Sequence, residues 1–212
     1  AQVRAQAAWG LGLKQDRRVV EPLIAALYDG DHHVRKQTAW ALGLQGDERS
    51  VEPLSAALRD SSPEVREQAA WALGLKGDQR SVEPLVVALQ DSQEPVRQQA
   101  AWALGLKGDS RAVEPLVAAL KDNSAAVREQ AAWALGLKGD HRSIEALNAA
   151  MKDESKGVRK NAAWALGLIL MRDGKAGDKL MNLDLNLDLK FDNEEKETKR
   201  GAGRKPRTDS QN

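Results

Sequence analysis

Apolar and polar residues along the first 171 positions follow a pattern that repeats every 31 residues. In one copy, two segments carry apolar residues at helical spacing. In segment 48–59 these residues are Val51, Leu54, Ala57 and Leu58. In segment 64–75 they are Val65, Ala69, Ala72 and Leu73. Each 31-residue unit is therefore predicted to be a pair of α-helices.

Local signals place the ends of these helices. Asp47 is the expected N-cap of the first helix, because its carboxylate can accept from free amides of the first turn. Pro53 lacks an amide donor, so either the opening turn is a 3-10 helix or regular helix begins nearer Ser50. The glycines at 74 and 77 predict that the second helix ends in a left-handed conformation, which glycine adopts readily.

The fixed period predicts how the helix pairs assemble. The stretch VREQAAWALGLKGD occurs without a difference at 65–78 and at 127–140. Such self-similarity in a helical chain predicts stacked repeats, because one helix pair cannot bury its own apolar face. We predict an all-α, right-handed superhelical solenoid over residues 1–171, with five full repeats preceded by one second helix. The chain begins at Ala1 within a repeat, so we expect it to be a fragment of a longer protein.

The repeated motifs GDxRxVEPLxxAL and VRxxAAxALG resemble the HEAT-like repeats, in the short form named after phycobilisome lyases. They are also similar to repeat regions of bacterial sensor-type membrane metallopeptidases. The resemblance implies a scaffold in which an aspartate closing the first helix pairs with the arginine six residues later, forming a ladder across the repeats. The pairs it implies are Asp29/Arg35, Asp60/Arg66, Asp91/Arg97, Asp122/Arg128 and Asp153/Arg159.

One position departs from the pattern of that family. An isoleucine usually stands just before the Gly-Asp turn, and Ile169 keeps it in the last unit. The other units have polar residues there, namely Gln45, Lys76, Lys107 and Lys138. We expect these side chains to lay their methylenes over the core and to extend outward to solvent.

Every tryptophan of the chain occupies the same place in the repeat: Trp9, Trp40, Trp71, Trp102, Trp133 and Trp164. A helical wheel places Trp40 with Lys36, Gln37 and Leu44 on the side away from the core. The carboxamides three residues before each tryptophan form a second column: Gln6, Gln37, Gln68, Gln99, Gln130 and Asn161. In HEAT-like proteins this face lines a concave groove. The indoles either cover the seam between helices or form a binding surface together with the carboxamides, and we favour binding of an extended peptide or partner protein.

Composition removes most kinds of chemistry. The chain has no cysteine and three histidines, and no His-Glu pair or helically spaced histidines predict a metal site. The scattered serines have no histidine or aspartate positioned to activate them, and no phosphate loop or cofactor motif is present, so the sequence predicts a non-enzymatic scaffold without a cofactor. Net charge is +1 and the array itself is neutral, which disfavours nucleic acid as its partner. A bilin-lyase-like, chromophore-handling role is an alternative, and no sequence signal indicates a compartment.

The segment 172–212 differs from the array, and we predict a poorly structured tail. Residues 180–191 alternate like a strand, so pairing with another chain is an alternative. Residues 199–207 carry five basic residues, which suit a solvated end, nucleic acid, or a contact with the array's own groove. Several residues match EF-hand positions, but Leu189 replaces the required glycine, so we expect no calcium site. These residues are Asp184, Asn186, Asp188, Asp192 and Glu195.

Overall fold

The structure is a computed structural model that describes residues 1–14 and 16–172. This part of the chain forms eleven α-helices and no strand, which confirms the predicted all-α array of helix pairs preceded by one helix. The helices are α1 (Gln2–Gly12), α2 (Val20–Ala26), α3 (His32–Gln45), α4 (Val51–Ala57), α5 (Pro63–Lys76), α6 (Val82–Ala88), α7 (Glu94–Leu106), α8 (Val113–Ala119), α9 (Ala125–Lys138), α10 (Ile144–Ala150) and α11 (Lys156–Arg172). The division into an array and a tail stays a prediction, because the tail lies outside the described residues.

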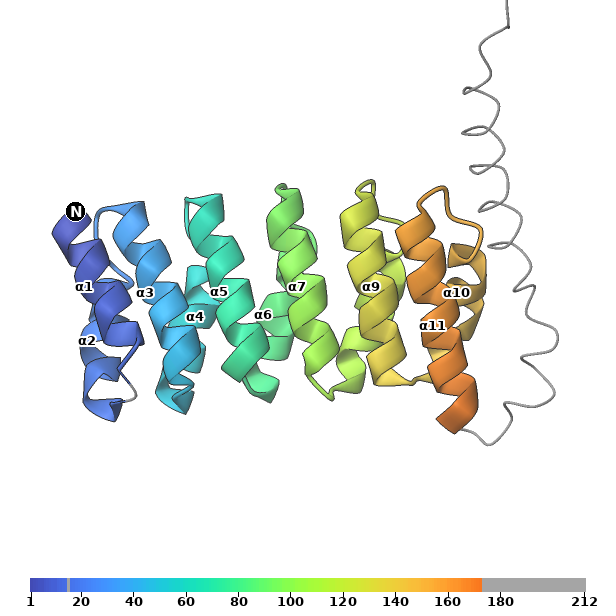
Figure 1. Cartoon of the computed structure of the whole chain (residues 1–212), viewed down its shortest axis with the longest axis horizontal. Coiled ribbons are helices and arrows are strands. Elements are labelled where there is room, and N and C mark those ends of the chain that lie inside the picture. Colours follow the sequence, from blue (N-terminus) through green and yellow to red (C-terminus); the bar gives the residue numbers. More distant parts are fainter. Residues whose placement is uncertain (15, 173–212) are drawn as a thin grey trace, which may run out of the picture.

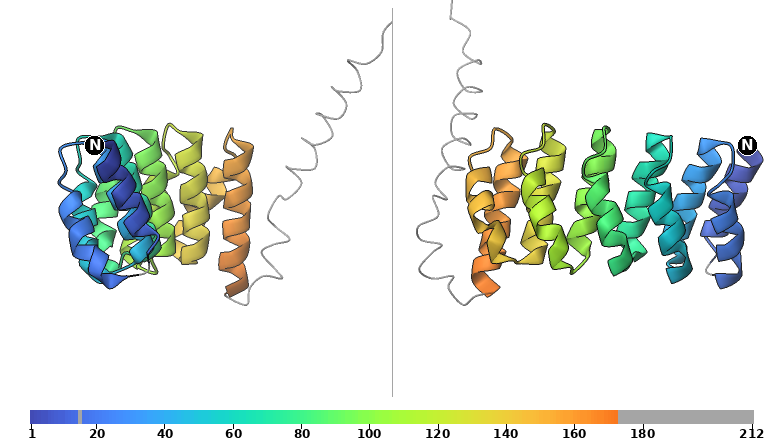
Figure 2. Two further views of the ribbon diagram at one scale, coloured as in Figure 1. Left: turned by 60° about the vertical axis from the view of Figure 1, so that its left-hand side comes forward. Right: turned by 180° about the vertical axis from the view of Figure 1, so that it is seen from behind.

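The helices follow one another in a row and form two layers (Figures 1 and 2). We call α1, α3, α5, α7, α9 and α11 the odd layer, and the five shorter helices the even layer. Each odd helix packs extensively against the odd helices before and after it, whereas an even helix packs mainly against the odd helix that follows it. Fully buried leucines fill the space between the layers, for example Leu85 from α6 and Leu104 from α7.

The starts of the even helices confirm the predicted capping. Asp47 accepts a hydrogen bond from the Arg49 amide, and a 3-10 turn (Glu48–Ser50) leads into α4. Pro53 therefore falls in the first turn of α4, where an α-helix leaves amides without a helical acceptor. Aspartates at the equivalent positions cap the other even helices in the same way: Asp16, Asp78, Asp109 and Asp140.

The ends of the odd helices agree only in part with the prediction. Gly46 and Gly139 adopt left-handed φ angles of 65° and 64°. Gly77 has φ −62° and ψ 156°, so the left-handed exit predicted there is wrong. In this extended conformation the Gly77 carbonyl accepts a hydrogen bond of 2.8 Å from Lys107 Nζ of the next repeat. The neighbouring repeat thus decides how α5 ends.

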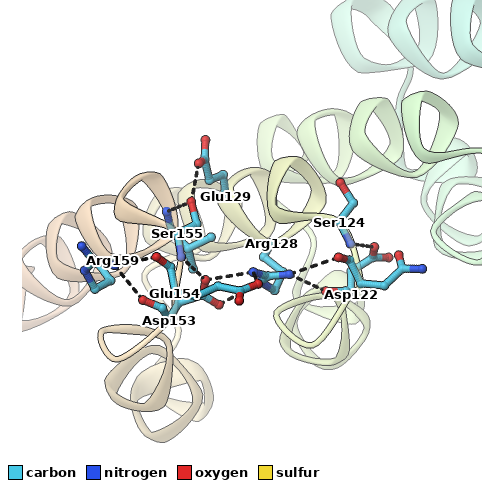
Figure 3. A network of polar contacts seen from close by, with 10 residues as sticks. Asp122, Ser124, Arg128, Glu129, Asp153, Glu154, Ser155 and Arg159 are labelled. Carbon is cyan, nitrogen blue, oxygen red and sulfur yellow. Dashed lines mark hydrogen bonds and ion pairs between the residues drawn. The ribbon is translucent and has the colours of Figure 1, made fainter.

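An arginine–aspartate ladder joins adjacent repeats near the turns that lead into α3, α5, α7, α9 and α11, and Figure 3 shows the junction formed by Arg128 and Asp153. Each arginine donates through Nε and Nη2 to both carboxylate oxygens of an aspartate 25 residues later, over 2.6–2.9 Å. The observed pairs are Arg4–Asp29, Arg35–Asp60, Arg66–Asp91, Arg97–Asp122 and Arg128–Asp153. The expected ion pairs between residues six apart are therefore wrong: Asp29/Arg35, Asp60/Arg66, Asp91/Arg97, Asp122/Arg128 and Asp153/Arg159.

The geometry of the turn explains this correction. The Asp91 carboxylate accepts from the Gln93 amide and receives Arg66 from the preceding repeat. Arg97 reaches Asp91 only at its backbone carbonyl, through Nη1 over 2.9 Å, while the rest of its guanidinium binds Asp122. Burial acts to raise the pKa of Asp91. The hydrogen bonds from Arg66 and the Gln93 amide act in the opposite direction and together outweigh burial, so the pKa lies below its ordinary value. Each arginine therefore ties its own turn to the next one.

Arg159 is the last of the arginines expected in the ladder, and the structure contradicts its predicted pairing with the Asp153 carboxylate. That carboxylate instead binds Arg128 of the preceding repeat. Arg159 donates through Nη1 to the backbone carbonyls of Asp153 and Glu154, over 2.8 and 2.9 Å, and its Nε is buried. The residue 25 positions after Arg159 is Asp184, which lies outside the described residues. Arg159 therefore holds its own turn through the backbone carbonyls of Asp153 and Glu154.

Glycine and alanine let the odd helices approach closely. A methyl group placed on Gly105 would lie 2.8 Å from Ala134 Cβ and 3.0 Å from Trp133 Cζ3 of the next repeat. The same crowding occurs at Gly12, Gly43, Gly74 and Gly136. Gly167 in the last repeat meets no atom of the described residues within 4 Å. At five positions of this column the next odd helix leaves no room for a side chain larger than that of glycine. Gly167 has no such neighbour among the described residues.

We expect opposite effects from the same substitution at two positions of this column. Gly105→Ala should lower the free energy of unfolding by about 1–3 kcal/mol, because the added methyl overpacks the contact with Ala134 and Trp133. Gly167→Ala should raise it by up to about 1 kcal/mol, because alanine is the better helix former and nothing there is crowded. Chemical denaturation of both variants measures the difference. Equal changes in the two would contradict the close-approach argument.

The ladder gives a second prediction. Arg97→Ala should lower the free energy of unfolding by about 1–3 kcal/mol, because it removes the guanidinium from the largely buried Asp122 carboxylate. The matched change Arg111→Ala removes an exposed arginine that binds Asp109 and should cost about 0–1 kcal/mol. Thermal unfolding of the two variants in the same buffer tests this order. A melting temperature of Arg97→Ala at or above that of Arg111→Ala would show that the ladder does not stabilise the array.

Candidate binding surface

The six tryptophans lie on the odd layer, and five of them contact the preceding odd helix. Trp9 and Trp164 at the two ends are 50% and 41% exposed, and the four between them are partly buried against the core. A methyl group on Gly43 would lie 3.0 Å from Trp71 Cζ3, and the later repeats repeat this contact. Each of these indoles therefore covers the seam between two helices while part of its surface stays accessible. The binding role of the column stays a prediction.

A column of leucines lies one helical turn after the tryptophans, and the sequence analysis did not include it in the site. Leu13, Leu75, Leu106 and Leu137 are 54%, 39%, 43% and 39% exposed. Residues four apart share one face of a helix, so each leucine is the neighbour of a tryptophan. The signal was present in the sequence, since the helical wheel placed Leu44 beside Trp40. We call the two columns together the Trp–Leu strip: Trp9, Trp40, Trp71, Trp102, Trp133, Trp164, Leu13, Leu44, Leu75, Leu106, Leu137 and Leu168.

The carboxamide column lies beside the Trp–Leu strip. Gln6 is exposed, and the central members Gln37, Gln68, Gln99 and Gln130 are half-buried. Within the described residues the side chains of these glutamines make no hydrogen bond. Asn161 differs, because its Nδ2 donates to the Glu129 carbonyl over 3.0 Å. The glutamine carboxamides thus have donors and acceptors available beside an apolar strip.

The polar residues just before the Gly-Asp turn do not all extend outward as expected. Gln45 Nε2 donates to the Gly12 carbonyl over 3.0 Å, and Lys107 Nζ donates to the Gly74 carbonyl over 2.8 Å. Both side chains turn back to the preceding odd helix, because its last carbonyls lack helical donors and attract positive charge. Lys76 is exposed and packs its methylenes against Gly46, as predicted.

Lys138 occupies the same position without reaching a partner. Its Nζ is buried and makes no hydrogen bond within the described part of the chain. Burial lowers the pKa of Lys138 to about 8, although the nearby Asp109 carboxylate acts in the opposite direction. The corresponding residue of the last repeat, Ile169, is fully buried. The fold therefore accepts an apolar side chain at this position.

Other kinds of site find little support in residues 1–14 and 16–172. No group of three His, Cys, Asp or Glu side chains there could hold a metal ion. No helix of this part is both long and apolar enough to cross a membrane. The calcium-like positions, the strand-like segment 180–191 and the basic run 199–207 lie outside the described residues.

Comparison with known proteins places this architecture. A profile of HEAT repeats matches residues 1–62, 51–135 and 113–184. The complex of CpcE and CpcF of phycocyanin lyase from Nostoc sp. is similar with a TM-score of 0.60 and 26% identity, covering 79% of this chain and 71% of that one. A designed armadillo repeat protein in complex with the peptide (KR)4 has a TM-score of 0.61 and 23% identity, covering 79% and 92%. None of the curated proteins compared matches the chain.

Replacement of Lys138 should stabilise the protein. Lys138→Ile should raise the free energy of unfolding at pH 7 by about 1–3 kcal/mol, because it removes a buried amine without a hydrogen bond. The folded-state pKa near 8 lies below the ordinary lysine value, so the unfolded state binds more protons between about pH 8 and 10.5. Stability of the unsubstituted protein should therefore rise through this interval, and the advantage of Lys138→Ile should shrink.

The matched control is Lys76→Ile, at the equivalent but exposed position. Denaturation of both variants at pH 7 and pH 10.5 measures the effect. A similar gain for the two variants, or a gain for Lys138→Ile that does not depend on pH, would contradict the assignment of a buried amine.

Proposed function

The chain belongs to the HEAT-repeat family, and on that premise we propose that it is a non-enzymatic scaffold that binds an extended segment of a partner protein. The binding surface is the Trp–Leu strip with the glutamine column beside it. HEAT-repeat arrays can serve very different functions, so the proposal rests on this surface rather than on the fold.

The observation that carries the proposal is the alignment of exposed leucines with partly exposed indoles across the odd layer. The exposed fractions of Leu13, Leu75, Leu106 and Leu137 lie between 39% and 54%. Single exposed leucines are ordinary, but a continuous apolar strip on a soluble protein usually marks an interaction surface. Consecutive odd helices also pack extensively against one another, which supports placing the groove expected from the sequence on this layer.

The spacing of the repeats suits an extended ligand. Packed helices lie about 8–10 Å apart, so each repeat presents one Trp–Leu pair at about that interval. A polyproline II chain advances about 9.3 Å in three residues, and a β-strand advances nearly as far. One side chain in three can then meet the strip. The carboxamides of Gln68 and Gln99 make no hydrogen bond to another described residue, so they can pair with the ligand backbone.

A second candidate function is that of a chromophore-handling lyase subunit. The likeness to CpcE and CpcF of phycocyanin lyase, at 26% identity over 79% of this chain, favours it. The two candidates differ in a direct measurement. A lyase subunit would change the absorption spectrum of an added bilin, whereas a peptide scaffold would leave that spectrum unchanged.

The structure offers a sharper test than removal of the tryptophans, because the indoles also pack against the preceding helix. Peptides of 15 residues would be selected from a random displayed library against the full chain. The triple variant Leu75→Gln, Leu106→Gln and Leu137→Gln should bind these peptides at least tenfold more weakly, because it removes exposed apolar contacts from the strip. Its melting temperature should stay within a few degrees of the unsubstituted protein, since these leucines are not core residues.

The control places the same kind of change on the even layer. Tyr28→Gln with Val87→Gln alters side chains that are 73% and 60% exposed and should leave peptide affinity unchanged. Unchanged affinity of the triple leucine variant, or an equal loss in the even-layer control, would refute the assigned surface.

A further inference from the structure

The Trp–Leu strip alone cannot fix where an extended ligand sits. Each repeat offers the same pair of side chains, so a ligand could slide by one repeat and meet the same surface. One position beside the strip is not repeated. Four residues before each tryptophan, the chain carries Ala5, Lys36, Glu67, Gln98, Glu129 and Lys160.

This variable column lies next to the tryptophans. Residues four apart are neighbours on one helix face, so Glu67 adjoins Trp71 and Glu129 adjoins Trp133. The side chains of Lys36, Glu67, Gln98 and Glu129 are half-buried, and Lys160 is exposed. Glu129 accepts a hydrogen bond of 2.9 Å from Ser155 Oγ. Lys36, Glu67 and Lys160 take part in no ion pair of the described residues. Their charges are therefore available to a ligand on the strip.

The signs along the column form a symmetric pattern. From α3 to α11 the residues are basic, acidic, neutral, acidic and basic. The first turns of the same helices add Glu64 and Glu94 in the acidic middle. The arginines of the middle helices point elsewhere, because they bind the aspartates of the ladder. The centre of the surface is thus negative, and its two flanks carry positive charge.

Resting on the proposed function, we infer that the partner is an extended peptide segment with two basic residues about six positions apart and an acidic residue three positions outside each of them. The two basic side chains face Glu67 and Glu129, where the indole faces of Trp71 and Trp133 also attract cations. The outer acidic side chains face Lys36 and Lys160. A shift by one repeat would place like charges together, and a shift by two repeats would keep only one of the four opposite-charge pairs, so the matched register is favoured. Because the pattern is symmetric, it does not select the direction of the peptide.

Two synthetic peptides test this inference by fluorescence anisotropy on the full chain. The matched peptide has Glu at positions 1 and 13, Lys at positions 4 and 10, and Gln at position 7. The inverted peptide exchanges Glu and Lys, and both share the same leucine, serine and proline residues elsewhere. At low ionic strength the matched peptide should bind about tenfold more tightly. The difference should shrink in high salt, because partly exposed charges are screened.

Charge reversal in the protein gives the decisive comparison. The double variant Glu67→Lys with Glu129→Lys leaves lysine at all four charged positions of the column, so each peptide meets two opposite and two like charges, and the matched peptide should lose its advantage. The control Glu48→Lys with Glu145→Lys makes the same change in net charge away from the strip and should keep the original preference. Equal binding of the two peptides to the unsubstituted protein, at an affinity that the triple leucine variant still lowers, would overturn the charge inference and leave the proposed function standing.

Two further outcomes would also overturn the inference. No measurable binding of either peptide would count against both the charge pattern and the proposed function. Replacement of all basic residues in 199–207 by Gln tests the chain's own segment as the occupant. A tighter binding of the matched peptide alone in that variant would assign the strip to this segment rather than to a separate partner.

Discussion

The close approach of consecutive odd helices is the constraint on which the other features depend. Where Gly105 faces Ala134, one additional methyl group would lie 2.8 Å from the next helix. At that separation the indole of one odd helix can lie across the seam and contact the preceding odd helix. The same spacing brings each guanidinium within hydrogen-bonding distance of the aspartate in the following repeat. Small residues at one position thus determine the pitch of the stack, and the surface columns inherit that pitch.

The tryptophans serve packing, and this changes how the surface is understood. Trp71 covers the seam at Gly43, so its indole is held in place by the packing of the two helices. A rigid aromatic surface loses little side-chain entropy on binding, which favours affinity. Leu75, Leu106 and Leu137, one turn later, are more exposed than the tryptophans beside them and are not core residues. The two columns thus differ in how far they serve packing, and the glutamine side chains beside them make no hydrogen bond within residues 1–14 and 16–172.

The 31-residue period made the fold predictable, but it did not reveal which acceptor each ladder arginine binds. The helix pairs, the Asp47 cap and the outward face of Trp40 follow from local spacing, which one repeat contains. The acceptors of Arg97 and Arg159 do not, because a spacing of six and a spacing of 25 recur equally in a 31-residue repeat. At the spacing of six, Arg159 meets the Asp153 backbone carbonyl and not the predicted carboxylate. The identical stretches 65–78 and 127–140 have different backbone conformations at Gly77 and Gly139. The side chains that the following repeat places beside these two glycines differ, and Lys107 binds the Gly77 carbonyl.

The ladder has a consequence for how such a protein can change during evolution. In every observed pair the arginine of one repeat binds the aspartate of the next repeat. All junctions of the ladder are therefore formed by the same two residue types in the same order. Duplication or deletion of one 31-residue unit would therefore preserve all remaining junctions and alter only the length of the array. A longer array would gain one more indole and one more leucine in line. For the proposed peptide-binding role, the length of the ligand would then change in steps of one repeat, without a change in any interface.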